Sequence, residues 1–192
     1  MASDPSTPPP WAKGRSRRLL HTRVFDVRQT QFRHPARALA RDFVVIDAPD
    51  WVNVVALTPR HELVLVRQFR YGTAALSLEI PGGVIERGED PVRAGLRELR
   101  EETGYTGRRA RVLGHVHPNP ALQSNRCHLV LVRDALSNAP VQWDRDEELE
   151  ILTKPVDEVY ALAQRGRLTH ALVLDALLLF APVWARLKKR AV

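Results

Sequence analysis

The sequence predicts a single domain of the α/β class, and three observations support that prediction. A length of 192 residues is enough for one substantial hydrophobic core but too short for two. Residues 91–103 have the periodicity and the end signals of an amphipathic helix. Two runs rich in β-branched residues, 52–58 and 62–69, flank a short polar turn and predict a strand hairpin. Strands and helices that alternate in one chain indicate a sheet covered by helices.

The first part of the chain predicts a small β region of its own. Apolar stretches with strand character occupy residues 19–25 and 38–46, and the polar residues 28–37 between them are interpreted as a turn or loop. We therefore expect an N-terminal β region over residues 19–47, followed by the main body of the same domain at residues 48–192.

The chain is strongly basic, with a net charge of +7 and a sequence pI near 10.3. Part of this charge lies near the two ends, at Lys13, Arg15, Arg17, Arg18, Arg186, Lys188, Lys189 and Arg190. The sequence shows neither a basic strand with interleaved aromatic residues nor a recognition-helix pattern, so we do not expect a nucleic-acid partner. Residues 1–18, rich in proline and serine and then basic, are expected to form a flexible arm before a domain that spans residues 19–192.

The overall composition is typical of a soluble globular protein, with 44% hydrophobic and 27% charged residues. The first ten residues contain no apolar segment of the kind that secretory signals carry. The longest apolar run, residues 171–185, is interrupted by Asp175 and Pro182 and is too short to span a bilayer. We therefore expect a cytoplasmic protein without a membrane partner.

The predicted helix at residues 91–103 is bounded by its own sequence. Asp90 is a favourable N-cap, Pro91 suits the first helical position, and Gly104 suits the left-handed position after the last turn. One face carries a mostly apolar stripe that we expect to pack on the core, formed by Val92, Leu96, Leu99 and Thr103.

The opposite face of this helix is acidic. Glu98, Glu101 and Glu102 stand at positions i, i+3 and i+4, so their side chains share one face. Like charges at this spacing destabilise a helix by roughly 0.2–0.5 kcal/mol per pair. Two interpretations follow from the residues alone: a solvated acidic face, or a site for Mg²⁺ or Mn²⁺, which prefer oxygen ligands.

The rest of the chain predicts three strands followed by two helices. Residues 110–116, 127–134 and 148–152 have strand character. A helix is expected at residues 155–166, and a long amphipathic helix at residues 169–188 with a break or kink near Pro182.

The surroundings of the acidic face decide between its two interpretations. The stretch from Gly83 to Tyr105 resembles the Nudix box, and every fixed position of that pattern is filled, by Gly83, Glu89, Arg97, Glu98, Leu99, Glu101, Glu102, Gly104 and Tyr105. A chance match is on the order of 10⁻⁹ per start position at average residue frequencies. The resemblance implies an α/β/α sandwich with a central mixed sheet, and hydrolysis of a nucleoside diphosphate linked to another group with Mg²⁺ or Mn²⁺.

Two further segments indicate a branch of this family. Residues 66–71 before the box and 119–128 after it resemble the enzymes that hydrolyse ADP-ribose and nucleoside diphosphate sugars, and Pro120 matches a proline found beyond the box in the ADP-ribose group. The resemblance implies cleavage of the pyrophosphate to a nucleoside monophosphate and a sugar phosphate. It also implies a homodimer, because such N-terminal β regions often pair two subunits.

Six residues are candidates for substrate binding. Arg70, at a strand end, suits bidentate contact with a phosphate, and Gln68 suits a base or a ribose. Trp51 is either a core residue or a platform for a nucleobase. The last three suit the hydroxyl groups of a sugar, or belong to a plain polar loop: Asn119, Gln123 and Asn125.

The resemblance also implies a metal site and a catalytic base. It assigns the cations to the Gly82 carbonyl and to Glu98, Glu101, Glu102 and Glu147. The base is left open among Glu101, Glu147 and Glu148, because Arg145 fills a position where some relatives carry the glutamate base. Arg97 is expected to orient the box glutamates.

Two other functions remain open at this point. The first alternative is a hydrolase of a different nucleotide, such as a dinucleoside polyphosphate or an RNA 5′ end. The second is a non-catalytic module that senses nucleotides. The complete box argues against the second alternative, because a sensor need not keep all four of its glutamates.

Overall fold

The computed structural model describes residues 7–143, 145 and 148–189. The chain divides into two compact units. The N-terminal unit comprises Met1–Pro49 and Asn119–Asn125, and the larger unit comprises Asp50–Pro118 and Arg126–Val192. The division after Pro49 lies close to the boundary expected at residue 47, but segment 119–125, expected in the main body, clusters with the N-terminal unit.

A three-stranded antiparallel sheet forms the N-terminal unit, in the order β1-β2-β3. Its strands are Ala12–His21 (β1), Asp26–Arg33 (β2) and Ala40–Asp47 (β3). Two expectations were wrong here: residues 12–18 belong to β1 rather than to an arm, and residues 28–33 belong to β2 rather than to a loop. Because β1 is exposed along its whole length, its pairing does not require the apolar alternation by which a half-buried strand is recognised.

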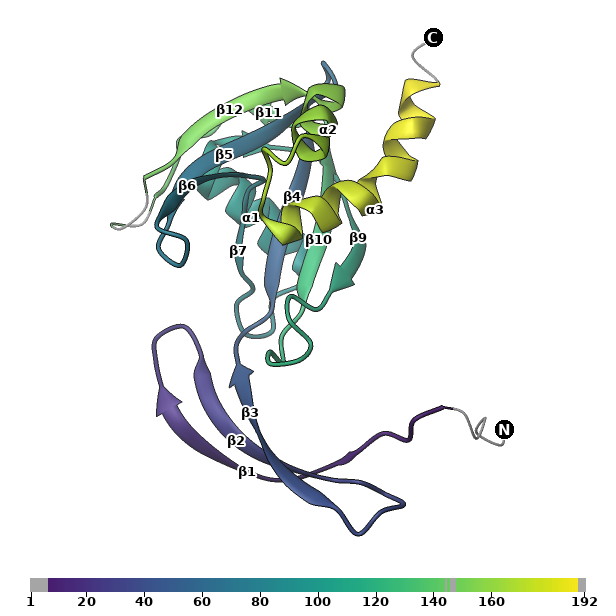
Figure 1. The fold of residues 1–192 in the computed structure, drawn as a ribbon. Coiled ribbons are helices and arrows are strands. Elements are labelled where there is room, and N and C mark those ends of the chain that lie inside the picture. The colour runs from purple at the N-terminus through teal and green to yellow at the C-terminus, as the bar shows by residue number, and fades with distance from the viewer. Residues whose placement is uncertain (1–6, 144, 146–147, 190–192) are drawn as a thin grey trace. The chain divides into compact units, whose positions relative to one another are not determined.

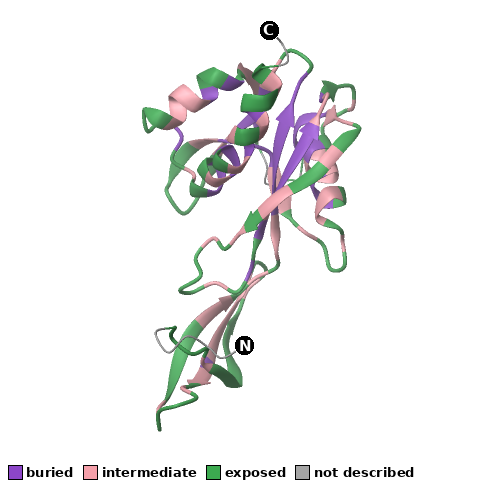
Figure 2. Ribbon diagram, turned by 90° about the vertical axis from the view of Figure 1, so that its right-hand side faces the viewer, coloured by how far each residue is buried: buried purple, intermediate pink, exposed green. Residues whose placement is uncertain are grey.

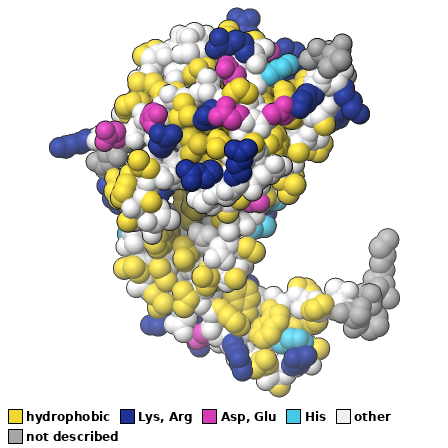
Figure 3. Space-filling model, turned by 45° about the horizontal axis from the view of Figure 1, so that its top comes forward, with side chains coloured by type: hydrophobic (Ala, Val, Ile, Leu, Met, Phe, Trp, Pro, Cys, Tyr) yellow, Lys and Arg dark blue, Asp and Glu magenta, His cyan; other side chains and the backbone are white. Residues whose placement is uncertain are grey.

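Segment 119–125 runs beside β3 and completes this unit. Ile46 donates its N–H to the Leu122 carbonyl at 2.7 Å, and the Ile46 carbonyl accepts from Ser124 at 3.0 Å. A hollow of about 430 Å³ is lined by both parts, through Trp11, Lys13, Phe32, Phe43, Val44, Val45, Pro120, Ala121, Leu122, Gln123 and Ser124. Figure 3 shows hydrophobic side chains gathered on the exposed surface of this unit.

A mixed seven-stranded sheet is the centre of the larger unit, with the order β12-β5-β4-β10-β9, β6 pairing with β5 and β7 with β4. Only the β4–β10 pair is parallel among the described strands. The strands are Trp51–Leu57 (β4), Glu62–Arg70 (β5), Ala75–Glu79 (β6), Gly82–Val84 (β7), Arg109–Val116 (β9), Cys127–Arg133 (β10) and Glu150–Pro155 (β12). Tyr105–Thr106 (β8) and Leu136–Ser137 (β11) form a separate two-stranded ladder.

Helices cover both faces of this sheet, as Figure 1 shows. Pro91–Thr103 (α1) packs on one face, and Val156–Gln164 (α2) and Ala171–Lys188 (α3) pack on the other. Alternation along β4 serves both layers, because Val54 joins the cluster with α1 whereas Val55 joins the cluster with α2 and α3. Figure 2 shows the buried residues concentrated in the central strands. The predicted α/β/α sandwich with a small N-terminal β region is confirmed.

The ends of α1 lie where the sequence places them. The Asp90 carboxylate accepts from the N–H groups of Val92 and Arg93 at 2.9 and 3.2 Å. Gly104 has φ = 69° and donates its N–H to the Arg100 carbonyl at 2.9 Å. The face of the helix presented to the rest of the unit is therefore set by its own capping residues.

The last helix, α3, contains Pro182, and Figure 1 shows the helix change direction along its length. Proline has no N–H for the preceding turn, which accounts for the predicted kink. The Tyr160 hydroxyl donates to the Leu177 carbonyl at 2.7 Å and ties α2 to α3. No helix in the described part of the chain has the length and apolar character needed to cross a bilayer.

Candidate active site

Two glycines before α1 allow the backbone and a carboxylate to meet. A Cβ added at Gly82 would lie 2.3 Å from the Val52 carbonyl oxygen. A Cβ added at Gly83 would lie 2.5 Å from the carboxyl group of Glu98. Real Cβ contacts are never this short, so any larger residue at position 83 would displace the Glu98 carboxylate. The glycine pair thus brings a strand, a loop and the acidic face of α1 together.

Arg97 binds three of the box carboxylates. Its Nε and Nη2 donate to the two Glu89 oxygens at 3.0 and 2.9 Å, and its Nη1 donates to Glu98 at 2.8 Å and to Glu101 at 3.1 Å. Nη2 also donates to the Val84 carbonyl at 3.1 Å. The hydrogen bonds that Arg97 donates to Glu89 hold the pKa of Glu89 below its usual value, and the same bonds raise the pKa of Arg97. The guanidinium therefore offsets much of the repulsion that the acidic face predicts.

Glu102 is the most buried of the box carboxylates on α1, at 5% exposure. Its Oε2 accepts from the Gly82 N–H at 3.0 Å, which links the helix to the loop before it. The end of the helix is held by a later segment: the Gln142 N–H donates to the Glu101 carbonyl, and the Trp143 indole N–H donates to the Glu102 carbonyl, both at 2.8 Å. Sequence reasoning missed Gln142 and Trp143, because bonds to helix carbonyls leave no residue pattern.

These groups line one cavity of about 450 Å³. Its lining residues come from β5, the loop and strand before α1, α1 itself and the segment that holds its end: Gln68, Arg70, Gly82, Gly83, Val84, Arg97, Glu98, Glu101, Glu102 and Gln142. Seven predicted site residues are therefore brought together, namely Gln68, Arg70, Gly82, Arg97, Glu98, Glu101 and Glu102. Arg70 lies in this lining while it donates to both carboxylate oxygens of Glu79, at 2.8 and 2.6 Å.

The donor set of the cavity fits a hard divalent cation. Carboxylate oxygens of Glu98 and Glu102 lie in a lining that also includes Gly82, whose carbonyl is a further oxygen donor. Among the described residues, no three acidic, histidine or cysteine side chains form a ready-made cation cage. Mg²⁺ does not require one, because it commonly binds through one or two carboxylates together with substrate phosphate and water.

Other predicted site residues are placed elsewhere. Trp51, half-buried, packs against the core cluster of α2 and α3 and is not part of the cavity lining. Asn119, Gln123 and Asn125 belong to the N-terminal unit, and the buried side chain of Asn125 has no hydrogen-bond partner among the described residues. Glu147 lies outside the described residues, whereas Glu148 is described and exposed.

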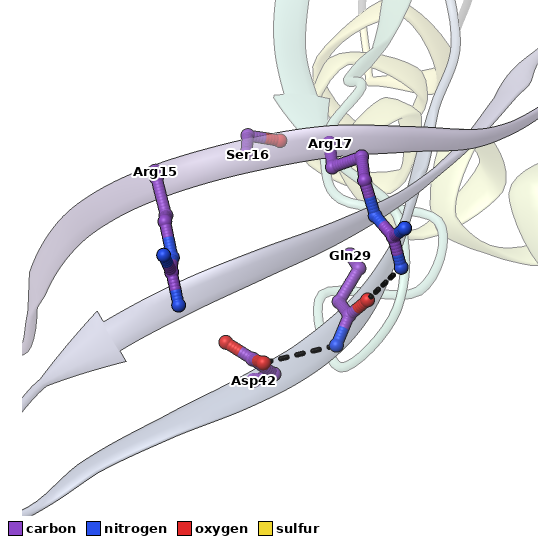
Figure 4. Close-up of a pocket in the computed structure, with 5 residues that line it drawn as sticks. All are labelled: Arg15, Ser16, Arg17, Gln29 and Asp42. Atoms are coloured by element: carbon purple, nitrogen blue, oxygen red, sulfur yellow. Dashed lines mark hydrogen bonds between the residues drawn. The ribbon is translucent and has the colours of Figure 1, made fainter.

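A second polar hollow, of about 350 Å³, lies on the N-terminal sheet (Figure 4). There Arg17 donates to the side-chain Oε1 of Gln29 at 3.0 Å, and the side-chain Nε2 of Gln29 donates to Asp42 at 2.9 Å, while Arg15 lies beside them. Its lining holds a single carboxylate among basic and neutral side chains. The cavity beside α1, where several carboxylates converge, is therefore the one with the chemistry of a cation site.

Comparison with known proteins identifies the family. Residues 49–177 match the NUDIX domain family. The chain is 28% identical over 146 residues to the ADP-ribose pyrophosphatase of Bacillus subtilis, covering 76% of each chain. It is 38% identical over 136 residues to the ADP-sugar pyrophosphatase of Mus musculus, covering 68% of this chain and 62% of that protein.

A solved structure shares the fold. The crystal structure of an ADP compounds hydrolase superposes with a TM-score of 0.81 at 21% identity, covering 96% of this chain and 99% of that one. The filled box, the carboxylate cavity beside α1 and the match over residues 49–177 lead to one conclusion. The chain belongs to the Nudix family.

Proposed function

We propose that this Nudix enzyme hydrolyses the pyrophosphate bond of nucleoside diphosphate sugars such as ADP-ribose, giving a nucleoside monophosphate and a sugar phosphate. One observation carries the proposal: the carboxylates of Glu98, Glu101 and Glu102 share a cavity with Arg70 and Gln68. Carboxylates suit cations that neutralise a diphosphate, and a guanidinium suits the diphosphate itself. The names of the two pyrophosphatase relatives support this substrate class.

The proposed cofactor is Mg²⁺ or Mn²⁺, held by the Gly82 carbonyl, Glu98, Glu101, Glu102 and Glu147. When bound, such ions neutralise phosphate charge and make a bound water more acidic. Another side chain of the protein positions these carboxylates. Arg97 fixes the carboxylates through the hydrogen bonds that it donates to Glu98 and Glu101.

The hydrolytic step needs a base. The oxygen of a water molecule attacks one phosphorus, the bond to the bridging oxygen breaks, and that oxygen leaves with the other phosphate. A carboxylate takes the proton of the water. The proposed candidates are Glu101, which lines the cavity, and Glu147 and Glu148 on the segment before β12.

The proposed substrate-binding roles differ in what supports them. Arg70 is proposed to contact the diphosphate and Gln68 the ribose or the base, because both line the cavity. Roles for the other four residues, stacking by Trp51 and hydroxyl contacts by the amide side chains, rest on the family resemblance alone: Trp51, Asn119, Gln123 and Asn125.

We further propose that the enzyme is a cytoplasmic homodimer that pairs through the N-terminal sheet. Large hydrophobic side chains are exposed on this unit, at Leu19, Leu20, Val24, Phe43 and Val44. Large exposed apolar side chains gathered on one unit are typical of interaction surfaces. Light scattering coupled to size-exclusion chromatography gives the mass in solution, and a monomer at micromolar concentration contradicts the pairing.

A substrate panel tests the activity. Purified protein is incubated with Mg²⁺ or Mn²⁺ and ADP-ribose, other nucleoside diphosphate sugars, a dinucleoside polyphosphate or a capped RNA. Added phosphatase then releases inorganic phosphate from the monophosphate products, whereas an intact nucleoside diphosphate sugar resists it. Preferential turnover of the sugars supports the proposal. Turnover confined to the polyphosphate or the RNA contradicts it, and binding without any turnover indicates a sensing module.

Glu102→Gln tests the metal assignment, because it keeps the shape of a buried residue and removes its charge. We expect turnover to be lost while the melting temperature stays close to that of the wild type. The matched control is Glu62→Gln, which removes a partly buried carboxylate paired with Arg60 at 3.2 Å. Activity retained in Glu102→Gln would reject the assignment.

A further inference from the structure

Glu79, at the end of β6, is a buried carboxylate that the proposed reaction does not use. Its side chain is 2% exposed, and both of its oxygens accept from Arg70, with Nε at 2.8 Å and Nη2 at 2.6 Å. The Arg70 side chain is 44% exposed and lines the carboxylate cavity. Glu79 therefore lies directly behind the one residue of the cavity lining that we assign to the diphosphate.

Burying the Glu79–Arg70 ion pair costs hydration energy, and a gain in stability alone does not account for its presence. Burial raises the pKa of Glu79, but the hydrogen bonds and the charge of Arg70 outweigh it, so that the pKa lies below its usual value. The carboxylate is thus ionised at neutral pH. A buried ion pair is often no more stable than apolar residues of the same volume, because both charges lose their hydration. An orienting role explains why a charge is kept at this position.

The geometry of the pair fixes the plane of the guanidinium group. Nε and Nη2 form one edge of the fork, and both engage Glu79 at the same time. This turns the Nη1 edge away from Glu79. A guanidinium held by two parallel hydrogen bonds has already lost its freedom to rotate. The arginine side chain therefore loses less conformational entropy when a phosphate binds the other edge of the group.

His170 supports Glu79 from the opposite layer of the fold. It is the N-cap residue of α3, and its Nε2 lies 3.7 Å from the Glu79 Oε2. Its Nδ1 is buried and has no hydrogen-bond partner among the described residues. Burying a polar nitrogen without a partner is unfavourable, and such a group in a folded protein calls for a reason. The electrostatic contact of Nε2 with Glu79 offsets part of this cost.

We propose that Glu79 is a positioning residue, which holds the Arg70 guanidinium in one orientation for the substrate diphosphate, and that His170 supports Glu79 from α3. This inference rests on the proposed function and deepens it. Glu79 touches no substrate atom, and its effect passes entirely through Arg70. Removal of Glu79 should therefore matter only while Arg70 can form its fork.

A double-mutant cycle tests this dependence. The variants are Arg70→Lys, which keeps the charge but loses the fork, Glu79→Gln, and the two combined. With ADP-ribose and saturating Mg²⁺, Glu79→Gln should raise KM by roughly tenfold and lower kcat less, which is within the range of coupled neighbours. In the Arg70→Lys background the same change should alter KM by less than about twofold. Equal effects in both backgrounds would overturn the inference.

A second arm does not depend on turnover. The same cycle is measured on the dissociation constant of ADP-ribose in EDTA by calorimetry, and the same non-additivity is expected. An active wild type with additive effects contradicts only the role of Glu79. An inactive wild type contradicts the proposed function, and the binding cycle still decides whether Glu79 acts through Arg70.

His170→Gln guards against misfolding of the Glu79 variant, because it leaves the Glu79–Arg70 pair intact. It should raise KM by about two- to threefold in the wild-type background and have no effect beside Arg70→Lys. A change that persists beside Arg70→Lys would contradict the support role. Glu62→Gln is the matched control, because it removes another Arg–Glu pair, between the start of β5 and the turn before it, outside the cavity, and should leave KM unchanged.

Discussion

The box helix and the N-terminal sheet both carry several charged side chains but arrange them differently. On α1, one arginine binds Glu89, Glu98 and Glu101 above two glycines that bring the backbone close. On the N-terminal sheet, basic residues such as Arg15 and Arg17 stand exposed, and the side-chain amide of Gln29 lies between Arg17 and the Asp42 carboxylate. Crowded and neutralised charge is what a chemical site requires, whereas dispersed charge mainly interacts with water.

The largest difference between the two regions is expected when a glycine in each is replaced by alanine. Gly83→Ala places a methyl group 2.5 Å from the Glu98 carboxyl group, so the carboxylate must move. We expect kcat/KM for ADP-ribose to fall by at least about 100-fold, because misplacements near 1 Å have effects of that size. Gly14→Ala in β1, where the nearest atom is the Gln31 carbonyl oxygen at 3.3 Å, is the counterpart. Equal losses in the two variants would remove the distinction between the regions.

Arg97→Met tests the neutralisation itself. It leaves three carboxylates without the guanidinium, so we expect roughly a 10- to 100-fold loss of activity, as for residues that orient metal ligands. The pH dependence of unfolding should change as well. The pKa of Glu89 is lowered in the folded state, so its stabilisation is present above the ordinary value of 4.5 and is lost as pH falls through the lowered folded value.

Melting temperatures from pH 7 to pH 3 measure this effect. The wild type should lose stability below about pH 4.5 more steeply than Arg97→Met, which lacks the pairing. Arg17→Met, in the N-terminal sheet, is the control and should follow the wild-type curve. An Arg97→Met curve parallel to that of the wild type would contradict the assignment.

A smaller effect on activity is expected for Trp143, which contacts the end of α1 from a segment outside the box. Trp143→Phe keeps the ring and removes the N–H that donates to the Glu102 carbonyl. We expect a loss of about 1 kcal/mol in the free energy of unfolding, the usual value of one hydrogen bond, together with a several-fold lower kcat. Trp11→Phe in the N-terminal unit is the counterpart for activity. Denaturant unfolding and steady-state kinetics check both variants, and an unchanged Trp143→Phe would exclude a role for this bond.

The smallest effect on the chemistry should come from the exposed face of the N-terminal sheet. Phe43→Ser removes a large exposed hydrophobic side chain of β3. It should convert the proposed dimer into a monomer in light scattering while the melting temperature of the larger unit changes little. A variant that remains dimeric would place the pairing surface elsewhere.

Several features of the site could be predicted because their cause is local. Helix periodicity alone places Glu98, Glu101 and Glu102 on one face, and Asp90 and Gly104 end the helix where expected. Long-range partners could not be predicted this way. The Glu79–Arg70 pair is made across two strands, and the bond from Trp143 comes from a segment about forty residues beyond the one it holds.

What the sequence determined by itself was the box helix, its caps and its acidic face, because contacts within four residues decide them. In the N-terminal unit, local patterns gave wrong predictions, because exposed polar residues there form β1 and β2 through pairing between strands. Only the tertiary structure decided that Arg70 and Gln68 share a cavity with the carboxylates and that Trp51 does not. The physical reason is that strand order and burial depend on contacts between distant segments, which no local pattern records.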